Sequence, residues 1–222
     1  MKIGTDGVLL GAWAPTPPAP PAEIWDVGAG TGLIALMAAQ RFPHSHITAI
    51  EIEENAAGEA LDNIKNSPWA DRIRLVKGDI KEVAPTLPAP EMIISNPPFY
   101  KEDIQSPDKR RNTARHESSL PLETLISLAS ASLPKGGSLA FIAPYSRIEE
   151  IEYIAFLKKI VPTHLVPVIS KEGNMAGRVL VNLIKEISPS AIENEPIIIR
   201  DLSGNYTDGY RSITAEFYTH LK

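Results

Sequence analysis

The sequence predicts an α/β fold with a mainly parallel sheet of seven strands and helices on both of its faces. Short apolar runs, which are typical of buried strands, alternate from residue 24 onward with longer amphipathic runs, which are typical of helices. Such alternation is characteristic of strands joined by helical crossovers in a parallel sheet. We expect one domain over residues 1–222, with an N-terminal segment at 1–22 and the α/β core at 23–222.

The composition narrows the class of protein. A chain of 222 residues with 43% hydrophobic content can bury one sizeable core. It has no cysteine, which excludes disulfides, thiolate metal sites and cysteine nucleophiles, and we expect no metal. No apolar run is long enough to span a bilayer, and the opening residues are unlike a signal peptide, so we expect a cytoplasmic protein that contacts no membrane. Because the net charge is −5, nucleic acid would have to bind at a local basic patch.

The elements follow in order after a stiff, proline-rich connector at residues 15–21. Strands are expected where short apolar runs end in glycine or polar residues, namely at 24–27, 46–52, 72–77, 91–95, 139–143, 163–170 and 177–185, with a further late strand at 196–200. Helices are expected where apolar residues recur at helical spacing, in several cases just before a proline, namely at 33–41, 54–66, 122–133, 146–160 and 208–220.

A glycine-rich turn follows the first expected strand. Residues 24–33 read IWDVGAGTGL, so Gly28, Gly30 and Gly32 lie between a strand and a helix, where glycines allow a tight turn and a close approach to a ligand. The spacing is one residue short of the dinucleotide pattern G-x-G-x-x-G. Asp26 on the strand itself would repel a diphosphate but suits a cationic ligand.

Two further acids follow the next two expected strands. The Glu51 carboxylate can accept both hydroxyls of a ribose, and Asp79 in KGDI can reach an adenine amino group. With Asp26 and the glycine turn, these features match a nucleoside with a positively charged amino-acid tail, which describes S-adenosylmethionine. Taken singly, Asp26 could cap the next helix, and Glu51 or Asp79 could be a solvated acid at a strand end. Their order at successive strand ends favours the cofactor.

The stretch ISNPPFY at residues 94–100 ends the fourth expected strand at the same edge of the sheet. The Asn96 amide oxygen and the Pro97 carbonyl can accept the two hydrogens of a planar amino group, which frees the nitrogen lone pair for methyl transfer. Pro98 stiffens the turn, and Phe99, with Tyr100 beside it, offers a flat face on which a base can stack. The alternative is a turn with core aromatics, because Asn-Pro commonly opens turns.

A basic stretch follows directly, KEDIQSPDKRRNTARH at residues 101–116. Clustered arginine and lysine next to an active site can neutralise RNA phosphates, although a solvated loop would have the same composition. The candidates for RNA contact are Tyr100, Lys109, Arg110, Arg111 and Arg115. Further cations that could extend the patch are Arg147, Lys158, Lys159, Lys171 and Arg178.

These motifs together resemble a known group. D-x-G-x-G-x-G, an acid ending the second strand and N-P-P-[FY] ending the fourth are similar to the class I methyltransferases that act on planar amino nitrogens. The opening MKIGTDGVLLGAWA, the stretch ARHESSLPLETLISLAS and the C-terminal YRSITAEFY further resemble the bacterial tRNA1(Val) adenine-N6 methyltransferases, over nearly the whole chain. Members of that family usually carry extra residues before this opening.

The resemblance implies a Rossmann-like fold and S-adenosylmethionine-dependent N6-methylation of the tRNA adenosine just 3′ of the anticodon, with no protein partner required. It implies that the opening segment folds over the cofactor. The implied cofactor-binding residues are Thr5, Asp6, Gly7, Asp26, Gly28, Gly30, Gly32, Glu51, Asp79 and Asn96. The implied catalytic residues are Asn96, Pro97, Pro98 and Phe99.

Four other functions remain open at the level of sequence. A protein glutamine N5-methyltransferase also acts on a planar amide, but such enzymes usually carry a separate N-terminal helical domain that this chain lacks. A guanine-N2 methyltransferase of ribosomal RNA would use the same motif. A DNA adenine methyltransferase would usually need an added target-recognition region. A non-catalytic module that only binds the cofactor would have no need for N-P-P-F.

Overall fold

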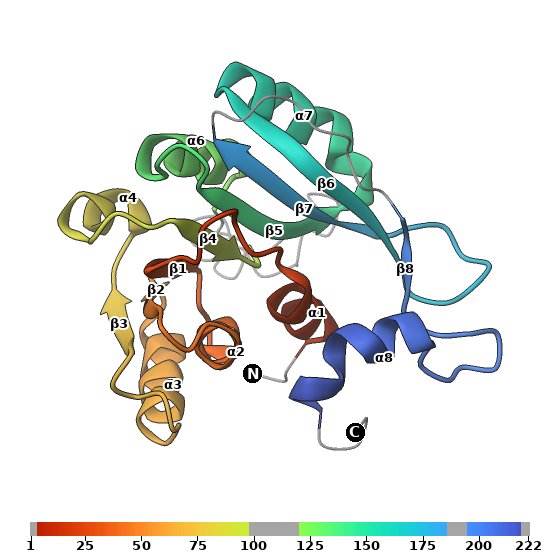
Figure 1. Cartoon of the computed structure of the whole chain (residues 1–222), viewed down its shortest axis with the longest axis horizontal. Helices are drawn as coiled ribbons and strands as arrows, with labels where there is room; N and C mark the ends of the chain where they lie inside the picture. The colour runs from red at the N-terminus through yellow and green to blue at the C-terminus, as the bar shows by residue number, and fades with distance from the viewer. Residues whose placement is uncertain (1–3, 98–119, 186–194, 219–222) are drawn as a thin grey trace, which may run out of the picture.

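The sheet of this protein has eight strands in the order β3-β2-β1-β4-β5-β7-β6-β8 (Figure 1). The structure is a computed structural model, and it describes residues 4–97, 120–185 and 195–218. The strands are β1 (Glu23–Val27), β2 (His46–Glu51), β3 (Ile73–Lys77), β4 (Met92–Ser95), β5 (Ser138–Pro144), β6 (Ile160–Ile169), β7 (Arg178–Lys185) and β8 (Ile197–Ile198). The sheet therefore has one strand more than the seven expected, because the late strand expected at 196–200 joins it as the two-residue β8, which pairs with β6.

The order in which successive parallel strands are added to the sheet reverses between β1 and β4. β1 pairs in parallel with both β2 and β4, and β5 continues the parallel order on the far side of β4. β7 is antiparallel to both β5 and β6. In sheets of this kind ligands bind beyond the carboxyl ends of the strands where the order reverses. The topology therefore predicts a ligand site at the carboxyl ends of β1 and β4.

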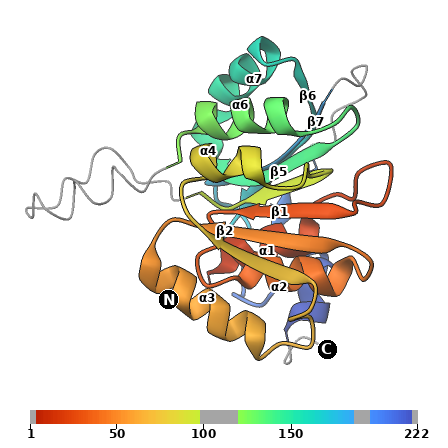
Figure 2. The same cartoon turned by 90° about the vertical axis from the view of Figure 1, so that its left-hand side faces the viewer.

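Helices cover both faces of the sheet, as expected (Figure 2). One face carries α1 (Thr5–Trp13), α2 (Leu33–Arg41), α3 (Glu54–Lys65) and α8 (Asp208–Thr214). The other carries α4 (Ile80–Val83), α6 (Leu122–Ser132) and α7 (Ile148–Leu157). Short 3-10 turns complete the set: η1 (Ala84–Thr86), η2 (Tyr145–Arg147) and η3 (Ala215–Phe217). Each face has its own apolar core, with Ile24 and Ile94 on the first and Trp25 and Ile93 on the second.

The helix α1 was not among the expected helices. Residues 7–11 are buried without a break, so this segment lacks the polar face by which an amphipathic helix is recognised. Its glycines also lower helix propensity. A Cβ on Gly11 would lie 2.8 Å from the Met37 sulfur, so the glycine allows α1 and α2 to pack closely.

Some expected boundaries differ by a few residues. β6 begins at Ile160 rather than at residue 163, and an irregularity in its pairing between Pro162 and His164 accommodates the proline. The last helix ends at Thr214 and continues as η3. In the three described ranges, no helix combines the length and apolar character needed to cross a bilayer. The same ranges hold no group of three or more His, Cys, Asp or Glu side chains that could bind a metal.

Candidate active site

The strand register brings three of the expected site residues into one row. Val27 of β1 is paired with Ile50 of β2 and with Ser95 of β4. The next residues along these three strands are Gly28, Glu51 and Asn96, which therefore lie side by side at the carboxyl edge. Adjacent strands are about 4.8 Å apart, so the backbone at Glu51 and that at Asn96 are separated by roughly 10 Å.

The glycine turn lies at the centre of this row. Gly28, Gly30 and Gly32 have φ angles of 73°, 56° and 81°, in the left-handed region that favours glycine. The backbone amides of Gly28 and Ala29 donate to the Ile50 carbonyl at 2.9 and 3.0 Å, which ties the turn to β2. A Cβ built on Gly28 would meet no atom of the described residues within 4 Å, so these residues leave open space above the turn.

The Glu51 carboxylate is held by two backbone amides. Gly30 N–H donates to Oε2 at 2.7 Å, and Glu53 N–H donates to Oε1 at 2.8 Å. The residue is only 8% exposed. Each carboxylate oxygen has a second lone pair, so both can still accept a hydroxyl. The acid is thus oriented before any ribose arrives.

Asp26 lies beneath the turn and is 1% exposed. Its Oδ2 accepts a hydrogen bond from Ala35 N–H at 2.8 Å, in the first turn of α2. This is the contact expected if Asp26 caps the next helix. Its Oδ1 is buried and has no partner among the described residues. Burial raises the pKa of Asp26 to about 7, the Ala35 hydrogen bond opposes this rise, and the Glu51 charge adds to it. An unpartnered buried carboxylate oxygen with open space above the neighbouring turn fits a cationic ligand.

Asp79 is the N-cap of α4. Its Oδ1 accepts from Lys81 N–H at 2.9 Å, and the Lys81 ammonium lies 3.4 Å from Oδ2. The preceding Gly78 donates its N–H to the Glu51 carbonyl at 3.0 Å, which places Asp79 just beyond Glu51 at the same edge. Asp79 is half-buried. The three acids therefore gather along one edge, as the sequence predicts.

Asn96 is half-buried and follows Ser95, whose hydroxyl donates to the Val27 carbonyl at 2.8 Å and links β4 to β1. The first turn of α1 lies against it. A Cβ built on Gly7 would be 3.7 Å from Asn96 Nδ2 and 3.3 Å from Leu33 Cδ2. The expected cofactor residues Thr5, Asp6 and Gly7 thus begin a helix next to Asn96.

Several expected site residues lie outside the described residues. These are Pro98, Phe99, Tyr100, Lys109, Arg110, Arg111 and Arg115. The five further cations divide between two edges of the sheet. Arg147, Lys171 and Arg178 adjoin the carboxyl ends of β5 and β6 and the start of the antiparallel β7, at the edge that holds the candidate site. Lys158 and Lys159 precede β6 and lie at the opposite edge.

Comparison with known proteins decides the family. Residues 15–166 match the model of the methyltransferase small domain. A tRNA1(Val) (adenine(37)-N6)-methyltransferase of Porphyromonas gingivalis is 41% identical over 99% of this chain and 89% of its own length. The chain belongs to the tRNA1(Val) (adenine(37)-N6)-methyltransferase family. A second member, from Bacteroides thetaiotaomicron, is 37% identical over 100% of this chain and 92% of its own length.

A solved structure agrees with the fold of this family member. The crystal structure of a predicted O-methyltransferase from Agrobacterium tumefaciens superposes with a TM-score of 0.73, at 22% identity, over 95% of this chain and 96% of its own. At that identity the likeness concerns the fold, and it confirms the expected Rossmann-like methyltransferase architecture.

Sequence reasoning missed one site contact in this methyltransferase. The Arg178 guanidinium donates to the Asp6 carboxylate, so an arginine considered only for RNA is ion-paired to the N-terminal helix. The two residues are 172 positions apart, and a local sequence pattern cannot predict a pairing over that separation.

Proposed function

We propose that this protein transfers a methyl group from S-adenosylmethionine to N6 of an adenosine in tRNA, at position 37 of tRNA1(Val). The observation that carries the proposal is the row of Gly28, Glu51 and Asn96 at one edge of the sheet. The proposal is also supported by the 41% identity of this chain, over 99% of its length, to a tRNA1(Val) (adenine(37)-N6)-methyltransferase. In the proposal, Glu51 is the acid that binds the nucleoside, the Gly28 turn is the surface that the ligand approaches, and Asn96 is the acceptor for a planar amine.

The cofactor residues have separate roles in this proposal. Glu51 accepts the two ribose hydroxyls with its pre-oriented carboxylate, and Asp79 accepts from the adenine amino group. Asp26 supplies negative charge beneath the positively charged end of the cofactor. Gly28, Gly30 and Gly32 keep the turn free of side chains at the surface of approach, and Thr5, Asp6 and Gly7 cover the site from the side of α1.

When bound, S-adenosylmethionine supplies an electrophilic methyl group on a sulfonium. The Asn96 side-chain oxygen and the Pro97 carbonyl accept the two hydrogens of the adenine amino group, and its lone pair, no longer delocalised into the ring, attacks that methyl. The N–C bond forms as the S–C bond breaks, and the surplus proton passes from nitrogen to water. No strong base is required, because orientation of the two reactants supplies much of the rate.

The substrate base must first leave its stack, which costs a few kcal/mol and is easier in an anticodon loop than in a duplex. In the proposal Phe99 stacks on the base, with Pro98 stiffening the turn and Tyr100 adding to the stack. The RNA phosphates are bound by Lys109, Arg110, Arg111 and Arg115. A tRNA substrate would place the enzyme in the cytoplasm, and the reaction as written needs no protein partner and no metal.

The test is a transfer assay with labelled S-adenosylmethionine and four acceptors: tRNA1(Val) transcript, ribosomal RNA, DNA and a release-factor protein. We expect label in the tRNA, recovered as N6-methyladenosine after nucleoside digestion, and none in a transcript whose adenosine 37 is replaced by guanosine. Label only in protein would indicate a glutamine methyltransferase, and N2-methylguanosine would indicate a guanine methyltransferase. Either result would overturn the proposal.

A further inference from the structure

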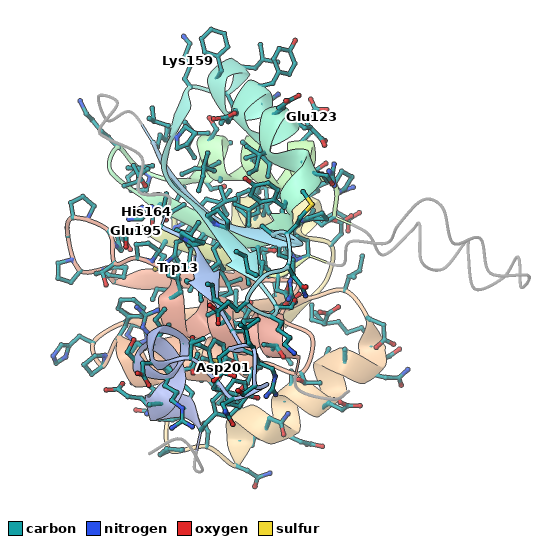
Figure 3. The ribbon with its side chains drawn as sticks, turned by 90° about the vertical axis from the view of Figure 1, so that its right-hand side faces the viewer. Trp13, Glu123, Lys159, His164, Glu195 and Asp201 are labelled. Carbon is teal, nitrogen blue, oxygen red and sulfur yellow. The ribbon has the colours of Figure 1, made fainter. Side chains whose placement is uncertain are left out.

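The helix α1 is fastened at its C-terminal end by two contacts. The Arg41 guanidinium donates to the carbonyls of Gly11 and Ala14 at 2.8 and 2.9 Å, which satisfies groups left open at the end of the helix. Trp13 packs its ring edge-on against His164 of β6, with ring centroids 6.0 Å apart (Figure 3). These contacts fix the end of α1 that is remote from Asn96.

The opposite end of α1 is fastened by an ion pair. Asp6, in the first helical turn, accepts from the guanidinium of Arg178, the first residue of β7. Arg178 is itself held, because its other nitrogen donates to the Ser170 hydroxyl at 3.0 Å. The side chains of Arg178 and Asp6 are only 27% and 33% exposed, so the pair is partly shielded from water and salt.

Gly7, next to Asp6, faces Asn96 and Leu33, because a Cβ built on it would lie 3.7 Å from Asn96 Nδ2 and 3.3 Å from Leu33 Cδ2. Successive residues in an α-helix are rotated by about 100°. A rotation of α1 by one position would therefore bring the side chain of Asp6 or Val8 towards Asn96. The glycine permits the close approach, but it cannot itself fix the rotation of the helix.

We propose that the Asp6–Arg178 ion pair is a positioning device for Asn96: it sets the rotation of α1, so that the backbone of Gly7 forms the wall that holds the Asn96 amide in place for methyl transfer. The inference rests on the proposed function and adds two positioning residues to it. Neither residue needs to touch the substrate, since both act through the helix.

The electrostatics of the pair agree with a positioning role. Burial raises the pKa of the Asp6 carboxyl, and this effect outweighs the opposing attraction of Arg178. Because desolvation offsets the Coulombic gain, such a pair contributes little net stability, yet loss of one partner leaves the other charge uncompensated. Asp6→Asn keeps a side-chain oxygen that can still accept a hydrogen bond from Arg178, whereas removal of Arg178 leaves a partly buried carboxylate without its charged donor. Removal of Arg178 should therefore be the more harmful change.

The experiment compares Asp6→Asn, Arg178→Gln, the double variant and the conservative Arg178→Lys with wild type. The matched control is Asp201→Asn, which makes the same change at a half-buried carboxylate (labelled in Figure 3) that accepts hydrogen bonds from Asn205 of its own turn. Two quantities are measured: kcat with its KM for tRNA at saturating cofactor, and amide hydrogen exchange across residues 5–13. The exchange measurement does not depend on any activity.

We expect kcat to fall by roughly 10- to 100-fold in Arg178→Gln, because small misplacements near the reacting atoms cost about that much. Asp6→Asn should lose less, and the double variant should be no worse than Arg178→Gln alone. The KM for tRNA should stay within about threefold, exchange in α1 should accelerate, and Arg178→Lys should restore most of kcat. Asp201→Asn should match wild type in every respect.

Unchanged kcat in Arg178→Gln would overturn the inference, as would a rise in the KM for tRNA with kcat intact, which would make Arg178 an RNA ligand. If the wild-type protein methylates none of the four acceptors, the proposed function fails by itself. The anchoring of α1 is then judged by exchange alone: faster exchange in Arg178→Gln and Asp6→Asn supports it, and wild-type exchange in both overturns it.

Discussion

Gly30 donates its backbone N–H to the Glu51 carboxylate at 2.7 Å, so the turn after β1 and the acid that ends β2 are one hydrogen-bonded unit. The other carboxylate oxygen is occupied by Glu53 N–H, at the start of α3. Glu51 therefore organises the backbone on both sides of it before any ligand binds. A substitution at this position should affect the shape of the turn as well as the contact with a ribose.

Glu51→Gln should weaken both cofactor binding and folding. A glutamine has one acceptor oxygen and one NH2 group, so it can satisfy only one of the two backbone amides and directs a donor at the other. An unsatisfied partly buried donor costs about 1–3 kcal/mol. We expect the free energy of unfolding to fall by about that amount in urea titrations, and the cofactor Kd, measured by calorimetry, to rise at least tenfold.

The control for this change is Glu54→Gln, three residues away. The Glu54 side chain is 79% exposed and pairs with Lys77 at 2.6 Å, so this substitution should alter the free energy of unfolding by no more than about 0.5 kcal/mol. Equal effects of the two substitutions would show that Glu51 has no special role in the turn.

Asp26 should make stability fall as the pH rises. Burial raises its pKa in the folded protein from 3.8 to about 7, so the folded state retains a proton that the unfolded state has already released. Its stabilising contribution is complete below about pH 4 and is lost as the pH rises through 7. The Asp26→Asn variant should lack this component and gain up to about 4 kcal/mol over wild type between pH 4 and pH 8. Urea titrations across that range give the measurement.

The same carboxyl should make cofactor binding depend on pH in the opposite sense. A cation bound nearby favours the ionised form of Asp26, so the affinity for S-adenosylmethionine should rise about tenfold from pH 6 to pH 8. Asp26→Asn should bind more weakly and without this trend. Equal wild-type affinity at the two pH values would mean that Asp26 does not sense the charge of the cofactor.

Local patterns in the sequence predict the strands and the acids well, because each depends on its immediate neighbours. The glycines after Val27 and the acid at Glu51 follow apolar runs whose length and composition indicate buried strands, and parallel strands necessarily end at a common edge. The Asp26 Oδ2 accepts from the next helix, as the capping explanation predicts, while Oδ1 has no partner among the described residues and is the atom available for the proposed cofactor contact.

The parts that could not be predicted depend on long-range contacts. The α1 segment has no helical period, since its residues 7–11 are all buried where it packs against α2, α8 and β5. Its side-chain partners Arg41 and Arg178 lie far along the chain. A late strand is expected at 196–200, but its reduction to the two residues of β8 and its pairing with β6 depend on the rest of the fold. Neither contact leaves a local trace in composition or spacing.

Arg41→Met should destabilise the protein by removing the cap on α1. It leaves the carbonyls of Gly11 and Ala14 without their charged donor, and hydrogen bonds to charged groups are worth about 1.5–3 kcal/mol each. We expect the free energy of unfolding to fall by about 2–4 kcal/mol in urea titrations. Arg211→Met, at an exposed position on α8, is the matched control and should be close to neutral. A small effect at Arg41 would mean that water replaces the guanidinium at these carbonyls.

Arg110→Glu combined with Arg111→Glu tests the basic stretch at residues 101–116, which lies outside the described residues. If this stretch binds RNA phosphates, reversal of two of its charges should weaken tRNA binding and reduce its salt dependence, since fewer counterions are released. Cofactor affinity should not change. Filter binding of the tRNA transcript at several salt concentrations measures the effect, and unchanged affinity would remove this stretch from the RNA-binding surface.

Asn96→Ala should separate chemistry from cofactor binding. Asn96 is one strand away from the Gly28 turn and two from Glu51, so its loss removes the proposed acceptor for the adenine amino group and leaves the proposed cofactor-binding acids in place. We expect kcat to fall by at least about 100-fold, the size seen when one pre-organised polar contact to a reacting group is removed. The cofactor Kd should stay within a few-fold of wild type.

Asn96→Asp is the more specific companion variant, because it keeps the acceptor oxygen and the shape of the side chain and adds a negative charge. If Asn96 acts by accepting a hydrogen bond, Asn96→Asp should retain more activity than Asn96→Ala; if both variants lose cofactor affinity as much as kcat, Asn96 is a structural residue.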